Sequence, residues 1–393
     1  MANSFTNIIP TIMAEGLEVL RESCATLSAV NTGYSAEARE IGDTITIPVP
    51  VAQSVAAVSP SNTPPANTDV TPTTVTIALD QWNKTDFHLT NKEELEIAAG
   101  GFINTQAGES VRALANEIDS DLLGQATVDA GVYNHIGTAG TTPFASEATF
   151  QTNWQKGARK LLRQGLARFG PDIFCVIDED AEGNLASLVQ FTDADRRGDT
   201  EGMIEGEIGR KMGSTWLVNQ NVKTFTGGTL SNGTGKLANV NGAVAAAATT
   251  MAIDETTLTG TLVDGDVFTV ASVTGYFMVT NGPQTAASNA IATVNFTPAA
   301  PTGGFADDAV VTFAADHVVN LAFHRNAFAL AFAPIQETGL DGGSAITETI
   351  TDPVSGVTLR LKITEEYYQT TWRWDVLYGV KCVRPELACR ILG

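Results

Sequence analysis

The segment most like a metal site is Asp178-x-Asp180-x-Glu182-Gly183, which begins like a calcium-binding loop. Calcium would need a bidentate glutamate at the twelfth position, where the chain has Val189. The residues before Asp178 also have the pattern of a strand, whereas such a loop follows a helix. Capping of a helix by Asp178 or Asp180 is therefore the better interpretation.

A phosphate-binding loop is suggested by Gly233-Thr234-Gly235-Lys236. The pattern requires a glycine five residues before Gly235, where the chain has Leu230. It also requires serine or threonine after the lysine, and Leu237 stands there. The segment therefore predicts a turn, and we interpret Arg197-Gly198-Asp199 as a loop.

The histidines and cysteines are too scattered to predict a metal site or a nucleophile. No pair has HxxxH, HExxH or CxxC spacing, and no GxSxG elbow occurs. Cys175 lies in the apolar run 173–177, which predicts a reduced thiol in the core. The residues concerned are His88, His135, His317, His324, Cys24, Cys175, Cys382 and Cys389.

Carboxylates are abundant, with 44 acidic residues against 23 basic ones and a net charge of −21. A pair of them could serve a hydrolase as acid and base, but no motif identifies such a pair. Exposed, solubilising carboxylates are the simpler interpretation. We therefore predict no catalytic, cofactor-binding or metal-binding residue, and keep a carboxylate-dependent hydrolase as an alternative.

Length and composition exclude several classes. The 393 residues suffice for two or three domains. The acidity argues against tight nucleic-acid binding, which needs a basic surface. The most apolar stretch, 318–335, is interrupted by His324 and Arg325, and the N-terminus lacks a signal-peptide pattern. We expect no membrane span and a cytoplasmic origin.

The N-terminal half predicts an arm, a hairpin and three helices. Apolar spacing over 5–30 indicates a helix or arm, which could face its own core or a partner. Alternation in 44–47 and 74–77 predicts two strands around a proline-rich tip whose only charge is Asp69. Such a hairpin is marginal alone, so it should lie on a neighbouring subunit; a surface loop is the alternative.

Helices are predicted over 90–99, 106–130 and 150–168. In the second, Val111, Leu114, Ile118, Leu122 and Ala126 share one face, with Asp119 elsewhere. The third carries the chain's only local basic cluster: Lys156, Arg159, Lys160, Arg163 and Arg168. A solvated or subunit-pairing face explains this cluster better than a DNA site.

The second half is predominantly β. A buried strand over 172–177 precedes a helix to about 191. From 224 to 317 short alternating segments such as 266–270 and 309–313 predict an inserted all-β sandwich or barrel. At the end, 357–364 and 372–382 predict a long antiparallel pair joined by about seven residues.

Several segments, in the same order, resemble the major coat proteins of short-tailed Salmonella-type phages, which have the Hong Kong 97 capsid fold. They are Gly42-Asp43-Thr44-Ile45-Thr46-Ile47-Pro48, Ala113-Leu114-Ala115-Asn116-Glu117-Ile118-Asp119, Asn320-Leu321-Ala322-Phe323-His324-Arg325-Asn326-Ala327-Phe328-Ala329-Leu330, Trp374-Asp375-Val376-Leu377-Tyr378-Gly379-Val380-Lys381 and Arg384-Pro385-Glu386-Leu387-Ala388.

The resemblance implies an α+β, Hong Kong 97-like fold with an inserted all-β domain. Its parts would be an N-arm (1–40), an E-loop (41–85), a peripheral domain with the spine helix (86–139), an axial domain (140–222), an inserted β-barrel-like domain (223–318) and a return through the axial and peripheral domains (319–393). Bridging contacts of that insertion use charged pairs in the family, but here Lys236 is the only cation from 224 to 317.

The resemblance further implies a capsid protein that forms pentamers and hexamers of an icosahedral head enclosing double-stranded DNA. Its partners would be its own copies, a scaffolding protein, a portal and weakly held DNA, in a virion assembled in the bacterial cytoplasm. Another β-rich phage structural or decoration protein is the alternative. Candidate inter-subunit contacts are Ile45, Ile47, Val75, Ile77, Arg159, Arg163, Asp264 and Asp266.

Overall fold

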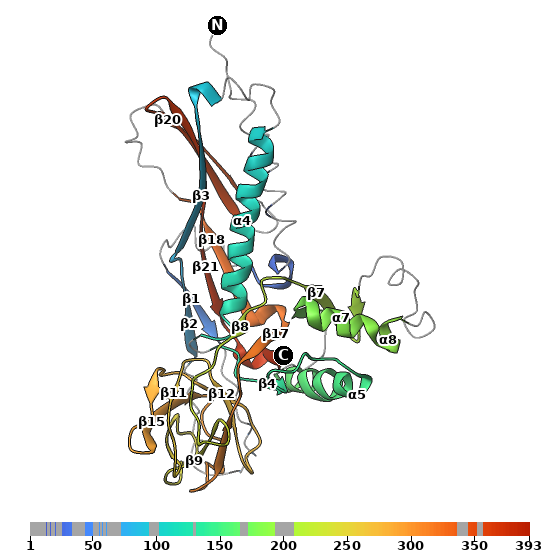
Figure 1. Ribbon diagram of the computed structural model, residues 1–393, viewed down its shortest axis with the longest axis vertical. Coiled ribbons are helices and arrows are strands. Elements are labelled where there is room, and N and C mark those ends of the chain that lie inside the picture. Colours follow the sequence, from blue (N-terminus) through green and yellow to red (C-terminus); the bar gives the residue numbers. More distant parts are fainter. Residues whose placement is uncertain are drawn as a thin grey trace.

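The computed structural model describes residues 13, 16, 20, 26–33, 44–49, 55, 57, 60, 72–93, 102–128, 131–165, 172–192, 208–335, 345–351 and 357–393. These residues form an elongated unit built on a long helix, a second sheet with helices to one side, and a barrel at the lower end (Figure 1). The fold class is α+β, as expected.

The elongated unit consists of helix α4 (Phe102–Gly124) along a five-stranded sheet. The predicted apolar face of α4 is buried, with Val111 and Ile118 packed in the same core as Trp374. The helix ends at Gly124 rather than at 130 because a turn follows, in which the Thr127 amide donates to the Gly124 carbonyl. The strands are β3 (Gln81–Thr90), β18 (Phe328–Ala333), β19 (Ala345–Thr351), β20 (Thr358–Glu366) and β21 (Gln369–Cys382).

The C-terminal pair differs from expectation at its turn. Glu366 pairs with Gln369, so Tyr367 and Tyr368 alone connect β20 and β21, instead of about seven residues. Both tyrosines have positive φ, as a tight hairpin turn requires. The sequence analysis also missed β3, whose exposed side carries Trp82, Lys84, Asp86 and His88 while Leu89 is buried on the other.

The predicted hairpin is present. Strand β1 (Thr44–Val49) pairs antiparallel with β2 (Thr73–Ala78), with Ile45 opposite Ile77 and Ile47 opposite Val75. Its apolar side packs on residues of β18 and β21. The tip between the strands lies outside the described residues except for 55, 57, 60 and 72.

The second sheet has the order β4-β22-β17-β5-β7-β6, with β8 on β17. Its strands are β4 (His135–Gly137), β5 (Ile173–Ile177), β6 (Arg210–Lys211), β7 (Ser214–Val218), β8 (Thr224–Phe225), β17 (His317–His324) and β22 (Ala388–Leu392). We call this sheet and its helices the axial unit. Strand β5 is buried as predicted, with Cys175 as a core thiol.

The two predicted helices of the axial unit depart from regular α-helices: the first is continuous but π-helical in its middle, and the second is divided. The helix expected over 150–168 comprises α5 (Glu147–Phe150), the π-helical η3 (Gln151–Ala158) and α6 (Arg159–Gly165). In η3, a Cβ on Gly157 would lie 2.1 Å from the Ile136 side chain, so glycine permits the close packing on β4. The helix expected to reach 191 is divided into α7 (Glu179–Ser187) and α8 (Val189–Thr192) by Leu188, which is extended.

Residues 237–313 contain a closed barrel of order β10-β15-β13-β12-β16-β9, which decides between the predicted sandwich and barrel. Phenylalanines such as Phe268, Phe277 and Phe296 pack edge to face inside it. The strands are β9 (Leu237–Val240), β10 (Thr250–Asp254), β12 (Val267–Val270), β13 (Phe277–Val279), β15 (Ala290–Thr297) and β16 (Val310–Phe313), beside the pair β11 (Thr261–Leu262) and β14 (Gln284–Thr285).

The N-terminal segment packs on its own chain where the structure describes it. Met13 and Leu20 are buried in the core beneath α4, and η2 (Leu27–Ala29) follows. Thr26 donates a hydrogen bond to Asp119, which is buried although the sequence analysis placed it away from the apolar face of α4. Thr90 and Glu93 form a capping box at the start of the helix predicted over 90–99, and the part of that helix after residue 93 lies outside the described residues.

Candidate functional site

The residues of the calcium-like segment cap a helix. The Asp178 carboxylate accepts a hydrogen bond from the Ala181 amide at 3.4 Å, at the start of α7. In the part of the chain that the structure describes, no three His, Cys, Asp or Glu side chains are grouped as metal ligands would be.

Lys236 of the phosphate-loop-like segment pairs with Asp316 at 3.1 Å. No helix among the described residues is long and apolar enough to cross a membrane.

The apolar contact candidates lie mostly inside the chain. Ile45, Ile47 and Ile77 are buried against the sheet of β18 and β21, and Val75 is half-buried. Their alternation reflects intramolecular packing, so we no longer propose these three side chains as inter-subunit contacts. The outward face of the hairpin is instead polar, with Thr44, Thr46, Thr74 and Thr76 exposed.

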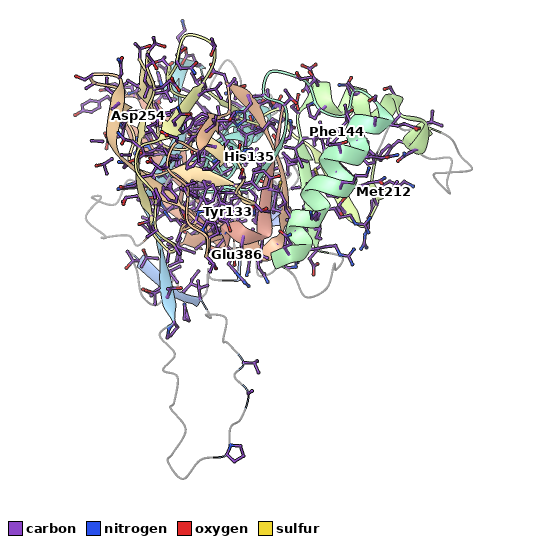
Figure 2. All side chains as sticks on the ribbon, turned by 90° about the horizontal axis from the view of Figure 1, so that it is seen from below. Tyr133, His135, Phe144, Met212, Asp254 and Glu386 are labelled. Carbon is purple, nitrogen blue, oxygen red and sulfur yellow. The ribbon has the colours of Figure 1, made fainter. Side chains whose placement is uncertain are left out.

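The basic candidates lie along η3 and α6. Lys156, Lys160 and Arg163 are exposed, and Arg159 is half-buried. Figure 2 shows the helical part of the axial unit, marked by Phe144, beside the barrel, marked by Asp254. Arg168 of the predicted cluster lies outside the described residues, and a subunit-pairing role of the cluster stays a prediction.

The two barrel carboxylates have different environments. Asp264 is exposed and accepts a hydrogen bond from the Gly282 amide. Asp266 is buried and accepts from the amides of Val263, at 2.8 Å, and Gly228, at 3.1 Å. Burial raises the pKa of Asp266. Asp266 therefore holds the barrel to the segment around Gly228 that leads into it, so its carboxylate serves a contact within the chain and is not an inter-subunit contact.

A junction that the sequence analysis missed centres on Arg390 of β22, which is fully buried. Its guanidinium donates to the carbonyl oxygens of Gly265, in the barrel, and Ala126, just after α4, and lies 5.8 Å from the centre of the Phe225 ring. Burial lowers the pKa of Arg390 to about 9, so it is charged at neutral pH. One side chain thus joins the axial sheet, the barrel and the end of the long helix.

Two buried histidines flank this cation. His135 and His317 use Nδ1 toward the carbonyl oxygens of Tyr133, at 3.1 Å, and Ala315, at 2.8 Å. Burial, with Arg390 nearby, lowers the pKa of each imidazole to about 4. Seen from below, His135 lies between the barrel and the axial helices (Figure 2). The signal in the sequence was a single cation in the apolar run 387–392.

No protein-family model matches the chain. No curated protein matches it either. Among solved structures, one from Mycobacterium phage Che8 is 16% identical, with a TM-score of 0.50, and the match covers 92% of this chain and 89% of that chain. The capsid structure of cyanophage P-SCSP1u is 14% identical, with a TM-score of 0.47 and coverage of 89% and 83%. The mature capsid of bacteriophage PhiM1 is 10% identical, with a TM-score of 0.46 and coverage of 90% and 83%.

The likeness to the Che8 structure, at this identity, shows a shared fold. The described part of the chain has the Hong Kong 97-like capsid fold, with the barrel inserted between β8 and β17 of the axial unit. The fold implied by the resemblance is therefore confirmed.

Proposed function

We propose that the chain is the major capsid protein of a tailed bacteriophage and assembles with its own copies into the pentamers and hexamers of an icosahedral head. The observation that carries the proposal is the Hong Kong 97-like fold over nearly the whole chain. The role is structural, because assembly needs complementary surfaces and no reaction. The Salmonella-phage type is part of this proposal.

The hairpin supports the proposal. Its buried isoleucines anchor β1 and β2 on the sheet of the same subunit, which leaves an outward face of exposed threonines. The sheet of the same subunit supplies the surface that a two-stranded hairpin needs in water, so the segment between the two strands is the part left to contact a neighbour. We propose that the E-loop, and above all residues 50–72, lies across an adjacent subunit. Arg159, Arg163, Asp264 and the half-buried Val75 remain proposed contacts.

The remaining parts of the proposal follow the division given above, with the N-arm at 1–40, the E-loop at 41–85, the peripheral and axial domains at 86–139 and 140–222, the insertion at 223–318 and the return at 319–393. A net charge of −21 suits a wall that holds packaged DNA weakly, because phosphate is repelled on average. A scaffolding protein and a portal would assist assembly in the bacterial cytoplasm before the protein becomes part of the virion.

Electron microscopy of the expressed protein, alone and with its scaffolding protein, tests the proposal. Shells or capsomer rings are expected, and small monodisperse particles under both conditions would refute it.

Deletion of residues 52–72 should prevent shell formation while leaving thermal unfolding of the free subunit unchanged, because Ile45 and Ile77 keep their packing. Normal shells from this variant would contradict the role of the E-loop. Sub-micromolar, salt-dependent DNA binding by the free subunit would contradict the acidic-wall argument.

A further inference from the structure

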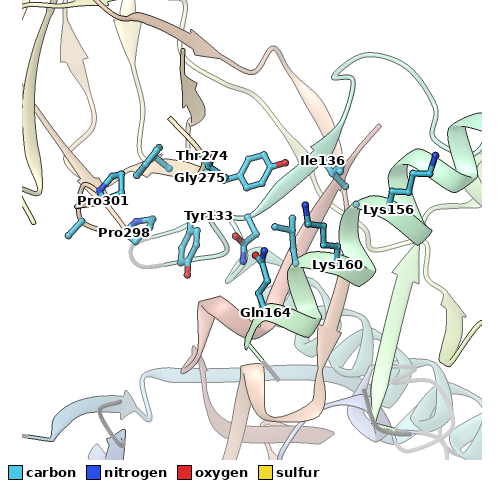
Figure 3. A pocket seen from close by; sticks show the side chains of 15 residues that line it. Tyr133, Ile136, Lys156, Lys160, Gln164, Thr274, Gly275, Pro298 and Pro301 are labelled. Carbon is cyan, nitrogen blue, oxygen red and sulfur yellow. The ribbon is translucent and has the colours of Figure 1, made fainter. Parts of the chain in front are cut away.

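A cavity of about 300 Å³ lies between the barrel and the axial helix formed by η3 and α6. On the axial side it is lined by Ile136, Lys160 and Gln164, and on the barrel side by the segment around Thr274 and by Pro298 (Figure 3). Its size suits one or two side chains of a partner. Neither structural unit encloses it alone, so an occupant would contact both.

The charge of this cavity is opposite to that of the chain. Its lining includes Lys156 and Lys160 and no aspartate or glutamate, although acidic residues outnumber basic ones by 44 to 23. Figure 3 shows the Lys160 ammonium and the Gln164 amide turned toward the cavity, while the Lys156 ammonium points away. Lys160 has no hydrogen-bond or ion-pair partner among the residues that the structure describes. Among the described residues, therefore, no carboxylate lines the cavity or pairs with this ammonium.

Two phenols that line the cavity are also available as hydrogen-bond donors at neutral pH. Tyr133 and Tyr276 both line it, and burial raises the pKa of each phenol, that of Tyr133 to about 12. Both therefore stay protonated and can donate an O–H. An ammonium, an amide N–H and phenol O–H groups beside apolar walls match a carboxylate on a short apolar stem.

We propose that this cavity receives an aspartate or glutamate side chain from a second copy of the chain. The inference rests on the proposed function, under which the neighbours of each subunit in the shell are its own copies. Charge complementarity identifies the occupant, because carboxylates are the most abundant charged groups that a copy presents. The contact is heterologous, with different surfaces meeting on the two subunits, as rings of subunits require.

Zero-length carbodiimide crosslinking of shells assembled from equal amounts of light and heavy isotope-labelled subunits tests the proposal. The reagent couples an amine to a carboxylate in direct contact. Lys160 should yield products that pair light with heavy peptides, and Lys160→Gln should lose them. The intramolecular pair Lys236–Asp316 is the matched control and should yield unmixed products only. Free subunits should yield no mixed product at Lys160.

Each other result has a distinct meaning. If shells form but Lys160 gives no mixed product and stays as reactive toward acetylation as in free subunits, the cavity is empty of a neighbour and the inference is wrong while the proposed function stands. Protection of Lys160 in free subunits by inorganic phosphate would assign the cavity to a small anion and overturn the inference. Absence of shells under every condition would refute the proposed function itself.

Discussion

The guanidinium of Arg390 donates a hydrogen bond to the carbonyl oxygen of Gly265, 3.1 Å away and 125 positions earlier in the chain. The bond crosses from the last strand to the barrel, and the same side chain also holds Ala126 at the end of the long helix. A buried charge is costly unless several dipoles compensate for it. The relative placement of three structural units therefore depends on one guanidinium.

Arg390→Met should lower the free energy of unfolding by about 2–4 kcal/mol, because the buried Gly265 carbonyl oxygen loses its donor, the Ala126 carbonyl oxygen keeps only the Val132 amide, and the smaller side chain leaves a void. Replacing a buried ion by an apolar residue is often harmless, but here the abandoned partners are backbone groups that cannot be replaced. Urea denaturation of the free subunit measures the effect. Arg384→Met, which removes a half-exposed pair with Glu386, is the control and should change little. Equal stability of the two variants would contradict the junction.

The subunit should lose stability as pH falls from about 6.5 to about 4. Burial depresses the folded-state pKa of His135 and His317 to about 4, so in this range the unfolded chain binds more protons than the folded one. The free energy of unfolding is therefore highest above the pKa that histidine has in the unfolded chain. It decreases by up to about 3 kcal/mol for each histidine as the pH falls from there to the folded-state pKa. The double variant His135→Gln, His317→Gln should flatten the dependence, measured by urea unfolding at several pH values. If exposed His88→Gln flattens it equally, the assignment is wrong.

Tyr368→Gly should stabilise the subunit by about 1 kcal/mol, because Tyr368 has a φ of 64° and a left-handed conformation costs a bulky residue about that much. The side chain is 85% exposed, so its removal sacrifices little packing. The hydrogen bond from the Asn91 amide to the carbonyl of residue 368 is kept. Thermal unfolding measures the gain. Tyr368→Ala retains the strain and should give no comparable increase; a similar increase would refute the strain argument.

Gly379→Ala should destabilise the subunit by about 1–3 kcal/mol and loosen the hairpin, because the new Cβ would lie 2.1 Å from the Ala78 carbonyl oxygen at the end of β2. The obstructing atom is backbone and cannot rotate away. Thermal unfolding measures the stability, and limited proteolysis measures the attachment of the hairpin. Gly183→Ala, in α7 with open space around the position, should instead stabilise by about 0.5–1 kcal/mol. Unchanged proteolysis of Gly379→Ala would show that β2 does not depend on this approach.

The sequence by itself determined the elements whose signal is local. Alternation in 44–47 and 74–77 located both hairpin strands, and turn-separated alternation located the barrel within 224–317. These patterns repeat every two residues, so a few neighbouring positions suffice to recognise them. The basic cluster on η3 and α6, and the ordered segments that indicated a capsid fold, were also visible without coordinates.

The tertiary structure alone decided which faces and charges meet. Ile45 and Ile77 are used within the subunit, Asp266 is a buried acceptor, and the cavity at Lys160 forms only because β13 and α6 come together. Strand β3 is recognisable through its pairing with β21, nearly 300 residues later in the chain. Such contacts depend on the spatial arrangement of distant segments, and local periodicity carries no information about which segment a residue will face.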